Sequence, residues 1–333
     1  MPTIRDVARR AGVAPITVSR VVNSSGYVSP ETRRRVEEAI EALGYVPNSV
    51  ARSLRSKQTR TIALVLTDMT NPFWTLVARG AEDAASQGNF NLILCNTDES
   101  EEKQARYLNV LLEKQVDGIL LVPARSRPEP VRLLQQQGVE VVVLDRRVPE
   151  VQVDTVRCDS VAAARDLTRH LLGLGHRRIA ILSGPPDVST AADRVTGYRQ
   201  ALEEAGVPVD ERLVLFGGFN QGAGFQMMRT VLSTSPRPTA VLAANNFIAI
   251  GAFRALREAG LAVPVDISLA AFDDLPATLV LEPFLTVVAQ PAYSMGRQAA
   301  ARLLSRLGGE AGPPQEILLP AEIIVRRSTA PPG

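Results

Sequence analysis

Charged side chains suited to holding a hydroxyl-rich ligand stand at the ends of apolar runs. Asp145 closes the run VVVLD and Asp273 closes LAAFD, so each carboxylate falls where a buried strand is expected to end. A pair of carboxylates at such an edge can accept hydrogen bonds from vicinal hydroxyl groups. Arg194, at the start of RVTGYRQAL, adds the planar donors of a guanidinium. These residues predict a binding site for a polar small molecule.

A short aromatic segment follows the first apolar run of the body. Phe73 and Trp74 could form a stacking platform for a flat or sugar-like ligand, or they could pack on their own lobe, and both readings stay open. Asn71 and Pro72, just before them, are explained as the N-cap and first turn of a helix. A ligand contact would be a secondary role for Asn71.

The sequence indicates binding rather than catalysis. Its only histidines, His170 and His176, form no nucleophile–base pair or metal set, and His176 in GHRR is expected to cap an element or lie on the surface. Cys95 and Cys158 lack metal-ligand spacing and are predicted to be buried, reduced thiols. No phosphate-binding GxxxxGK[ST] motif is present. We therefore expect no enzyme activity, no cofactor and no metal site.

The elements that must position the ligand residues alternate between strand and helix. Expected strands lie at 61–67, 91–97, 117–123, 139–145, 178–184, 212–218, 239–245, 267–273 and 285–290, and helices include 73–87 and 100–115. Continuous apolar strands alternating with helices predict parallel sheets covered on both faces, here two doubly wound lobes split near Asp159. After a helix to Leu307, residues 317–328 return the chain across both lobes. The expected division is 60–158 with 290–318 for one lobe and 159–289 with 319–330 for the other.

The first 46 residues have a different pattern, that of three short helices. Thr3 with Asp6 forms a capping-box start, and Gly12 ends the first helix. Pro15 suits the start of a second helix, and a third is expected from Ser29–Glu31 to Gly44. Two short helices around a glycine turn are typical of a helix-turn-helix.

Charge separates this head from the body. Residues 1–60 carry 11 basic and five acidic side chains, whereas the remainder of the 333-residue chain carries 26 basic and 30 acidic ones. A basic head on a mildly acidic body predicts a polyanionic partner for the head alone. No apolar run reaches membrane-spanning length and the N-terminal residues are not of signal-peptide type, so we expect a cytoplasmic protein without a membrane partner.

The head resembles a known DNA-binding domain. The runs DVARRAGVAPITVSRVVN and VSPETRRRVEEAIEALGYVPNSVARSL are similar, without gaps from residue 3 to about 57, to the head of the LacI/GalR (lactose-repressor/galactose-repressor) family of bacterial transcription regulators. The resemblance implies a hinge helix at 47–59 that places Leu54 in the minor groove. Ile16 would meet thymine methyl groups or read shape, and Arg20 would contact guanine. The DNA-binding residues so implied are Thr3, Pro15, Ile16, Thr17, Arg20, Asn23, Leu54, Arg55 and Lys57.

One departure from the family stands in the head. Ala14 replaces the usual serine or threonine cap of the recognition helix, and Pro15 offsets that loss in part through its fixed backbone angle. Because one helix-turn-helix covers few base pairs, we expect a homodimer on a pseudo-palindromic operator.

The body resembles the effector domain of the same family, which has the type I periplasmic sugar-binding fold. The stations TDMTNPFW, KQVDGILL, GHRRIAILSG, RVTGYRQAL and ISLAAFDD carry this likeness over nearly all of residues 60–328. Arg194 and Asp273 match the family's effector arginine and aspartate, Asn246 replaces a usual aspartate, and Asp274 is expected to be an outer, structural partner. The effector-binding residues so implied or suggested by their position are Asn71, Phe73, Trp74, Asp145, Thr190, Arg194, Phe219, Asn245, Asp273 and Gln290.

These observations predict a ligand-controlled transcription regulator, with a repressor as the leading interpretation. Its small-molecule effector is expected to bind in a cleft between the two lobes. A sugar or sugar derivative is the leading ligand class and a purine-like ligand the next. Induction and corepression both remain open. The alternative is a solute-binding protein without DNA function, which the lobes alone would support.

Overall fold

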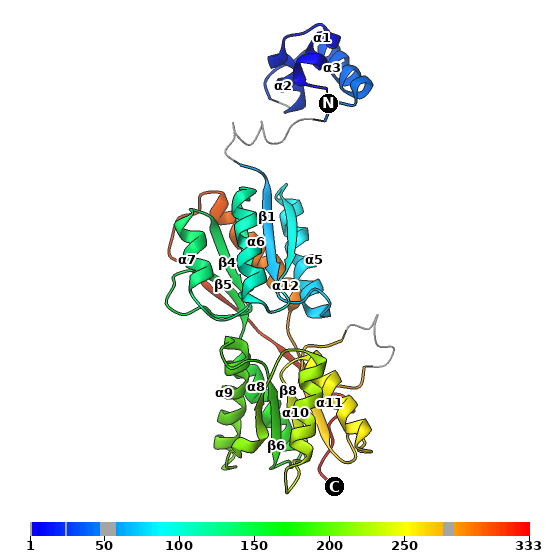
Figure 1. Cartoon of the computed structure of the whole chain (residues 1–333), viewed down its shortest axis with the longest axis vertical. Coiled ribbons are helices and arrows are strands. Elements are labelled where there is room, and N and C mark those ends of the chain that lie inside the picture. Colours follow the sequence, from blue (N-terminus) through cyan, green and yellow to red (C-terminus); the bar gives the residue numbers. More distant parts are fainter. Residues whose placement is uncertain (1, 24, 47–57, 276–282) are drawn as a thin grey trace. The chain divides into compact units, whose positions relative to one another are not determined.

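The computed structural model describes residues 2–23, 25–46, 58–275 and 283–333 (Figure 1). The chain forms two compact units, Met1–Thr59 and Arg60–Gly333. The predicted hinge residues Leu54, Arg55 and Lys57 lie outside the described residues.

The first unit is a small helical head. Its helices are α1 (Ile4–Ala11), α2 (Pro15–Val22) and α3 (Pro30–Leu43), and their buried faces meet around Val7, Val18 and Val36. The predicted caps are confirmed, because Thr3 and Asp6 close a full capping box and Gly12 and Gly44 end α1 and α3 in the left-handed conformation. That conformation is one that glycine adopts without a steric penalty.

The second unit is built on two six-stranded sheets. The N-lobe sheet contains, in spatial order, β11 (Glu316–Leu319), β5 (Asp154–Cys158), β4 (Glu140–Leu144), β3 (Gly118–Leu121), β1 (Thr61–Leu66) and β2 (Asn91–Asn96). The C-lobe sheet contains β12 (Glu322–Ile324), β10 (Thr286–Ala289), β9 (Ser268–Phe272), β8 (Ala240–Ala243), β6 (Ile179–Ser183) and β7 (Val214–Phe216). The pairings are parallel except for β10 with β12.

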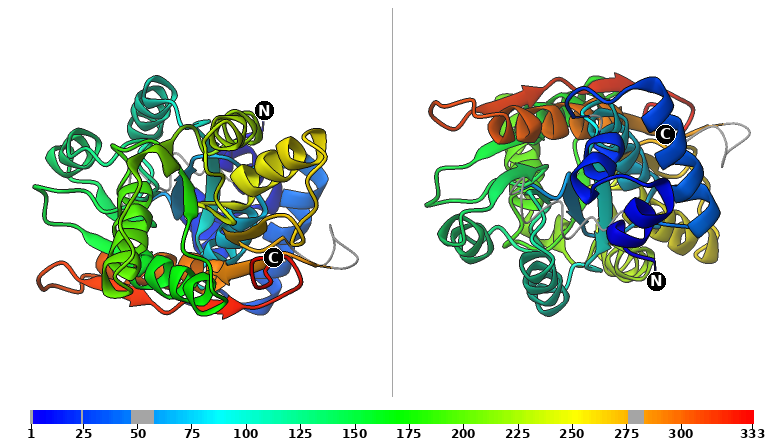
Figure 2. Two further views of the ribbon diagram at one scale, coloured as in Figure 1. Left: turned by 90° about the horizontal axis from the view of Figure 1, so that it is seen from below. Right: turned by 90° about the horizontal axis from the view of Figure 1, so that it is seen from above.

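Helices cover both faces of each sheet. In the N-lobe α5 (Pro72–Gln87) and α12 (Ala292–Leu307) share one core, while α6 (Glu101–Glu113) and α7 (Glu129–Gln136) pack on the other face. In the C-lobe α8 (Ser160–Gly173) and α9 (Ser189–Glu204) lie opposite α10 (Gln221–Leu232) and α11 (Asn246–Glu258), as Figure 2 shows in its left view. The predicted class, α/β with a helical head and two doubly wound parallel lobes, is confirmed.

Neighbouring helices approach closely at glycines. A side chain on Gly296 of α12 would lie 1.9 Å from the Val77 carbonyl oxygen of α5, and one on Gly80 would lie 2.0 Å from the Tyr293 carbonyl oxygen. The pair α10/α11 repeats this arrangement at Gly224 and Gly251. These helix pairs therefore exclude any Cβ at the contact.

Two local expectations need correction, and a third is confirmed. The sequence reading omitted β5, because Asp154 and Arg157 interrupt its apolar run, yet Asp154 is buried where Arg302 and Arg306 of α12 pair with it. The expected return of residues 317–328 across both lobes is confirmed, since β11 joins the N-lobe sheet and β12 the C-lobe sheet. The strand expected at 212–218 is short, because Glu211–Leu213 forms a 3₁₀ turn before β7.

The histidine and cysteine predictions had opposite outcomes. His176 was expected as a cap or surface residue, but it is buried, accepts from the Thr239 hydroxyl at 2.8 Å and donates to the Ala330 carbonyl at 2.9 Å. Desolvation lowers its pKa accordingly. Cys95 and Cys158 are buried free thiols, as predicted.

Candidate functional site

A cleft of about 420 Å³ is lined by residues of both lobes. Every residue predicted to contact the effector lines it, although these residues come from seven separate segments of the chain. The positions follow the topology, because parallel strands place their carboxyl ends at one edge of each sheet. The cleft volume falls within the range of roughly 300–1,000 Å³ that is usual for small-molecule sites.

Asp145 and Asp273 occupy equivalent places in the two lobes. Each directly follows a central strand, β4 or β9, and each is buried. Both adopt left-handed backbone angles, with φ of 64° at Asp145 and 66° at Asp273. Aspartate tolerates this conformation better than most residues do. The strand therefore ends in a sharp turn at the carboxylate.

Burial dominates the electrostatics of these carboxyl groups. Desolvation raises the pKa of Asp273 to about 6, against the opposing effects of Arg194 and of the Gln290 amide, whose Nε2 donates to Asp273 Oδ1 at 2.6 Å. Desolvation also raises the pKa of Asp145, opposed by Arg194 and Arg146. Each carboxylate is thus an acceptor whose charge is costly unless a donor meets it.

Arg194 is held in the cleft wall by α9. Its guanidinium lies over the Phe272 ring, 4.2 Å from the centroid, and Nη1 donates to the Ala244 carbonyl. The side chain is buried, and Nε has no hydrogen-bond partner within the described part of the chain. Thr190 lies one turn earlier on α9 and is also buried at the cleft. An incoming acceptor atom could satisfy the Arg194 Nε.

The aromatic residues divide into two kinds. Phe73 and Trp74 form an edge-to-face pair with centroids 4.8 Å apart, and both are buried in the N-lobe core, which favours packing over a free stacking platform. Phe219 is only partly buried, and its ring tip lies against Gly184, where a Cβ would be 2.1 Å from Cζ. Phe219 is the better candidate for stacking on a ligand.

Asparagines at the starts of helices form hydrogen bonds within and across the cleft. Asn245 caps α11 by accepting from the Ile248 amide at 2.7 Å, and its Nδ2 donates to the Phe219 carbonyl. Asn71 caps α5 through the Phe73 amide. Asn71 and Asn246 also exchange hydrogen bonds, Nδ2 to Oδ1, at 2.9 and 3.0 Å. The position that departs from the family pattern thus joins one lobe directly to the other.

Sequence reasoning missed a charged group at the N-lobe side of the cleft. Arg146 is buried and donates through Nη1 to Glu99 Oε2 at 2.8 Å, and Glu99 also lies 3.9 Å from Arg125. All three residues line the cleft. Glu99 and its neighbour Asp98 follow β2 with positive φ, so the strand-end rule applied to the 91–97 run would have identified them. Asp274, by contrast, pairs with Arg326 at 2.7 Å and is not among the cleft residues.

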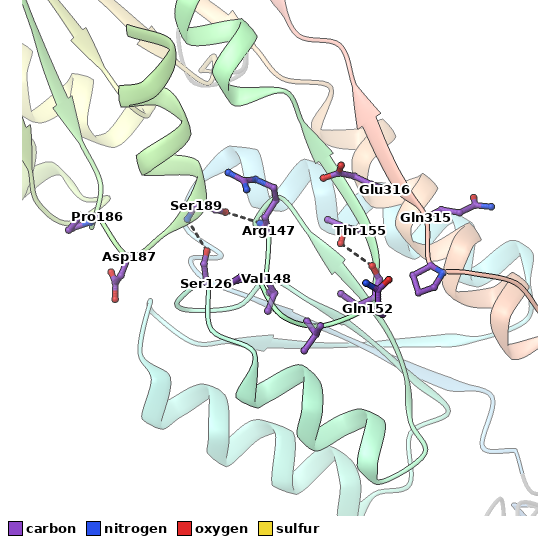
Figure 3. Close-up of a pocket in the computed structure, with 14 residues that line it drawn as sticks. Ser126, Arg147, Val148, Gln152, Thr155, Pro186, Asp187, Ser189, Gln315 and Glu316 are labelled. Atoms are coloured by element: carbon purple, nitrogen blue, oxygen red, sulfur yellow. Dashed lines mark hydrogen bonds between the residues drawn. The ribbon is translucent and has the colours of Figure 1, made fainter. Parts of the chain in front are cut away.

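A second cavity, of about 470 Å³, lies where N-lobe residues meet the segment 186–189 at the start of α9 (Figure 3). It contains none of the predicted effector residues. Its wall holds hydrogen bonds between the lobes, because the Ser189 amide donates to Ser126 Oγ at 2.8 Å and the Arg147 amide donates to Ser189 Oγ at 2.7 Å. Arg147 further pairs with Asp193. These contacts fasten the start of α9 to N-lobe loops.

The head presents most of its predicted DNA-binding residues to solvent. Pro15, Ile16 and Arg20 are exposed on α2, with Ile16 at 49%, an unusual exposure for an isoleucine. Thr17 is partly buried, and Asn23 donates from Nδ2 to the Ser19 carbonyl at 2.8 Å. Thr3 is occupied in its capping box. As expected, Ala14 supplies no side-chain cap to α2.

Metal-binding clusters and membrane-spanning helices are both absent from the described ranges. In those ranges no group of His, Cys, Asp and Glu side chains is arranged to hold a metal ion. No helix there has the length and apolar character needed to cross a membrane.

Comparison with known proteins places both units in one family. Residues 3–48 match the family model for bacterial regulatory proteins of the lacI family, and residues 59–326 match that for periplasmic binding proteins and the sugar-binding domain of the LacI family. Catabolite control protein A of Priestia megaterium is 37% identical over 98% of this chain and 99% of its own. The HTH-type transcriptional regulator CelR of Thermobifida fusca is 39% identical over 98% of each chain.

Solved structures agree with the sequence relatives. A complex of transcriptional regulator CelR with cellobiose has a TM-score of 0.75 at 37% identity and covers 98% of this chain and 100% of that one. The Lac repressor dimer bound to operator and the anti-inducer ONPF has a TM-score of 0.86 at 28% identity, covering 99% of both chains. This chain therefore belongs to the LacI family of bacterial regulatory proteins, as a DNA-binding transcriptional regulator.

Proposed function

We propose that the protein is a transcriptional repressor whose affinity for operator DNA is set by a sugar-like effector bound between its lobes. One observation carries the proposal: a single chain joins a helix-turn-helix head with exposed Ile16 and Arg20 to a cleft where Asp145, Arg194 and Asp273 converge. The first feature suits base edges in a major groove, and the second suits hydroxyl groups.

The head reads DNA as one half of a symmetric pair. Ile16 offers apolar contact to thymine methyl groups, and Arg20 offers bidentate donors to guanine. Pro15 and Thr17 flank Ile16, and the hinge residues Leu54, Arg55 and Lys57 follow as minor-groove and phosphate contacts by family resemblance. Two copies on a pseudo-palindromic operator supply the specificity that one small head lacks. The half-exposed Leu94 on edge strand β2 suits contact with a second copy.

The proposed domains divide the work. Residues 1–46 bind DNA, 47–59 form the hinge, 60–158 with 290–318 form the N-lobe, and 159–289 with 319–330 form the C-lobe. Sheet membership supports this division, with β11 ending one residue beyond it at Leu319. The effector favours one orientation of the lobes, that orientation sets the spacing of two hinge segments in the dimer, and the spacing decides whether both heads reach their half-sites.

The cleft residues act by binding and not by catalysis. The named relatives are regulators, and Asp145, Arg194 and Asp273 form a set of acceptors and donors without a nucleophile beside a base. A bacterial regulator of this kind works in the cytoplasm, where the chromosome is. The alternative of a solute-binding protein without DNA function is not favoured, because the relatives match the head as well as the lobes.

Selection from a random duplex library tests the proposal. We expect an enriched inverted repeat, retarded by the full chain in a mobility shift, with half-sites about one helical turn apart. Arg20→Ala should broaden the enriched sequence, while Arg34→Ala, on the exposed face of α3, serves as a matched control. A library without any enriched symmetric sequence would refute operator binding. Retardation that no sugar changes would refute the effector part alone.

A further inference from the structure

We infer that the effector is an uncharged, polyhydroxy compound such as a free sugar, and that the cleft rejects phosphorylated and carboxylated analogues. The inference rests on the proposed function and names the ligand class for that same cleft. It comes from how the charges lining the cleft are already paired.

Carboxylates outnumber cations along the described cleft wall. The acidic lining residues are Asp68, Asp98, Glu99, Asp145 and Asp273. The basic ones are Arg125, Arg146 and Arg194, and no lysine or histidine is among the described lining residues. An anionic ligand would therefore enter a field of its own sign, where like charges at close range oppose its binding.

Two of the three guanidinium groups are neutralised by acidic side chains. Arg146 donates to both carboxylate oxygens of Glu99, at 2.8 and 2.5 Å, and Nη1 also donates to the carbonyls of Pro123 and Ala124. Arg125 pairs with Asp187 at 3.2 Å. A phosphate could recruit either arginine only by displacing a carboxylate that is already in place.

The third guanidinium is shared between acids. The charge of Arg194 favours the ionised forms of both Asp145 and Asp273, and its Nη1 is bound to the Ala244 carbonyl. A dianion at Arg194 would meet both carboxylates as well. A hydroxyl group avoids this conflict, because it can accept from the arginine while donating to an aspartate.

Polar atoms without hydrogen-bond partners in the cleft wall also favour a ligand that carries hydroxyl groups. Thr67 Oγ1, Arg194 Nε and Gln290 Oε1 are all buried atoms, and none has a hydrogen-bond partner within the described part of the chain. They comprise a hydroxyl, a donor and an acceptor. Only ligand groups that both donate and accept can serve this mixture, and Phe219 offers one aromatic face beside them.

Matched probe pairs test the inference on the full chain. Glucose with glucose 6-phosphate, ribose with ribose 5-phosphate, and cellobiose with cellobionate are measured by thermal shift and titration calorimetry, with hypoxanthine as a flat, uncharged comparison. We expect at least one neutral sugar to bind, and its anionic partner to bind roughly a hundredfold more weakly or not at all. Tighter binding of any anionic partner, tighter binding of hypoxanthine than of every sugar, or no binding by the whole panel would overturn the inference.

Variants test whether the sugar binds in this cleft, and they separate the inferred ligand class from the proposed regulatory function. Asp273→Asn should abolish the sugar response, whereas Asp274→Asn, which loses only the pair with Arg326 outside the cleft, should keep it. Glu99→Gln leaves Arg146 and Arg125 without their shared carboxylate. The ratio of the affinity for a neutral sugar to the affinity for its phosphorylated partner should therefore fall about tenfold or more. An unchanged preference in Glu99→Gln would show that charge pairing does not select the ligand. If the unaltered protein does not retard any operator DNA in a mobility shift, that result contradicts the proposed function instead.

Discussion

Replacing Asn246 by alanine should loosen the two lobes from each other. The Asn71 and Asn246 amides are buried and exchange two hydrogen bonds across the cleft, at 2.9 and 3.0 Å. Asn246 is the first residue of α11, where alanine is an excellent helix former. The substitution therefore removes this one contact between the lobes without disturbing the helix, whose cap is Asn245.

The expected magnitude follows from two lost hydrogen bonds. Each contributes about 1 kcal/mol net, so their joint loss weakens the closed orientation by about 2 kcal/mol. Asn71 Nδ2 would remain buried without an acceptor, which adds to the cost of closure until the lobes part and admit water. Since 1.4 kcal/mol is about a tenfold change, effector affinity should fall roughly thirtyfold. The reason is that Asp145 of one lobe and Arg194 of the other line the same cleft, so a ligand that contacts both depends on how firmly the lobes are held together.

A double-mutant cycle isolates the pair from other roles of its members. Asn71→Ala also removes the α5 cap, but that loss cancels when Asn71→Ala, Asn246→Ala and the double variant are compared. We expect a coupling free energy of about 2 kcal/mol in effector binding, with a larger radius of gyration by X-ray scattering in each single variant. As a control, Asn220→Ala removes a similar cap on α10. The effects of Asn71→Ala and Asn220→Ala on the free energy of effector binding should be additive. If the effects of Asn71→Ala and Asn246→Ala on effector binding are additive and the radius of gyration is unchanged, the Asn71–Asn246 pair does not hold the lobes together.

The remaining predictions concern the cleft, the fold and the head. Because burial raises the pKa of Asp273 to about 6, its carboxylate is present above that pH, so effector affinity should fall as pH is lowered from about 7.5 to about 5 in calorimetry, and Asp274→Asn, outside the cleft, should keep the same pH dependence. Gly296→Ala should lower the free energy of unfolding by about 2–3 kcal/mol in urea titrations, since its Cβ would meet the Val77 carbonyl, whereas Gly173→Ala in α8 has open space and should be neutral or stabilising. Arg20→Ala should relax base preference in competition binding, with unaltered preference removing it from the readout. Leu54→Ala should reduce operator affinity about tenfold or more while leaving non-specific binding unchanged, and equal losses on both DNAs would argue against a minor-groove wedge.

Much of the fold was predictable because local and global signals agree. The continuous apolar runs at β1, β4, β8 and β9 could only be buried strands, and strand-end aspartates fall together by topology alone. What failed were features that depend on partners distant in sequence. Asp154 made β5 look unlike a strand, since nothing local reveals that α12 brings Arg302 and Arg306 to it.

The candidate site shows the same limit. Glu99 and Arg146 are 47 residues apart, and their pairing, which decides how the cleft treats anions, has no local signature. The aromatic pair shows a different ambiguity. Phe73 and Trp74 follow a strand end, as a ligand platform would, but they also start α5, whose buried face turns both rings into the N-lobe core. Sequence position located these side chains at the cleft without fixing their direction.

Helix α9 gives the proposed coupling a physical route. Its first turn is fastened to N-lobe loops through Ser189 and the Arg147–Asp193 pair, while Thr190 and Arg194 of the same helix line the cleft. A ligand that binds Arg194 therefore acts on the helix that also carries contacts between the lobes. Such a ligand can shift the lobe equilibrium only by its difference in affinity for the two orientations. The ligand residues are divided between the lobes, with Asp145 in the N-lobe and Arg194 and Asp273 in the C-lobe, so binding favours the orientation in which one ligand contacts all three.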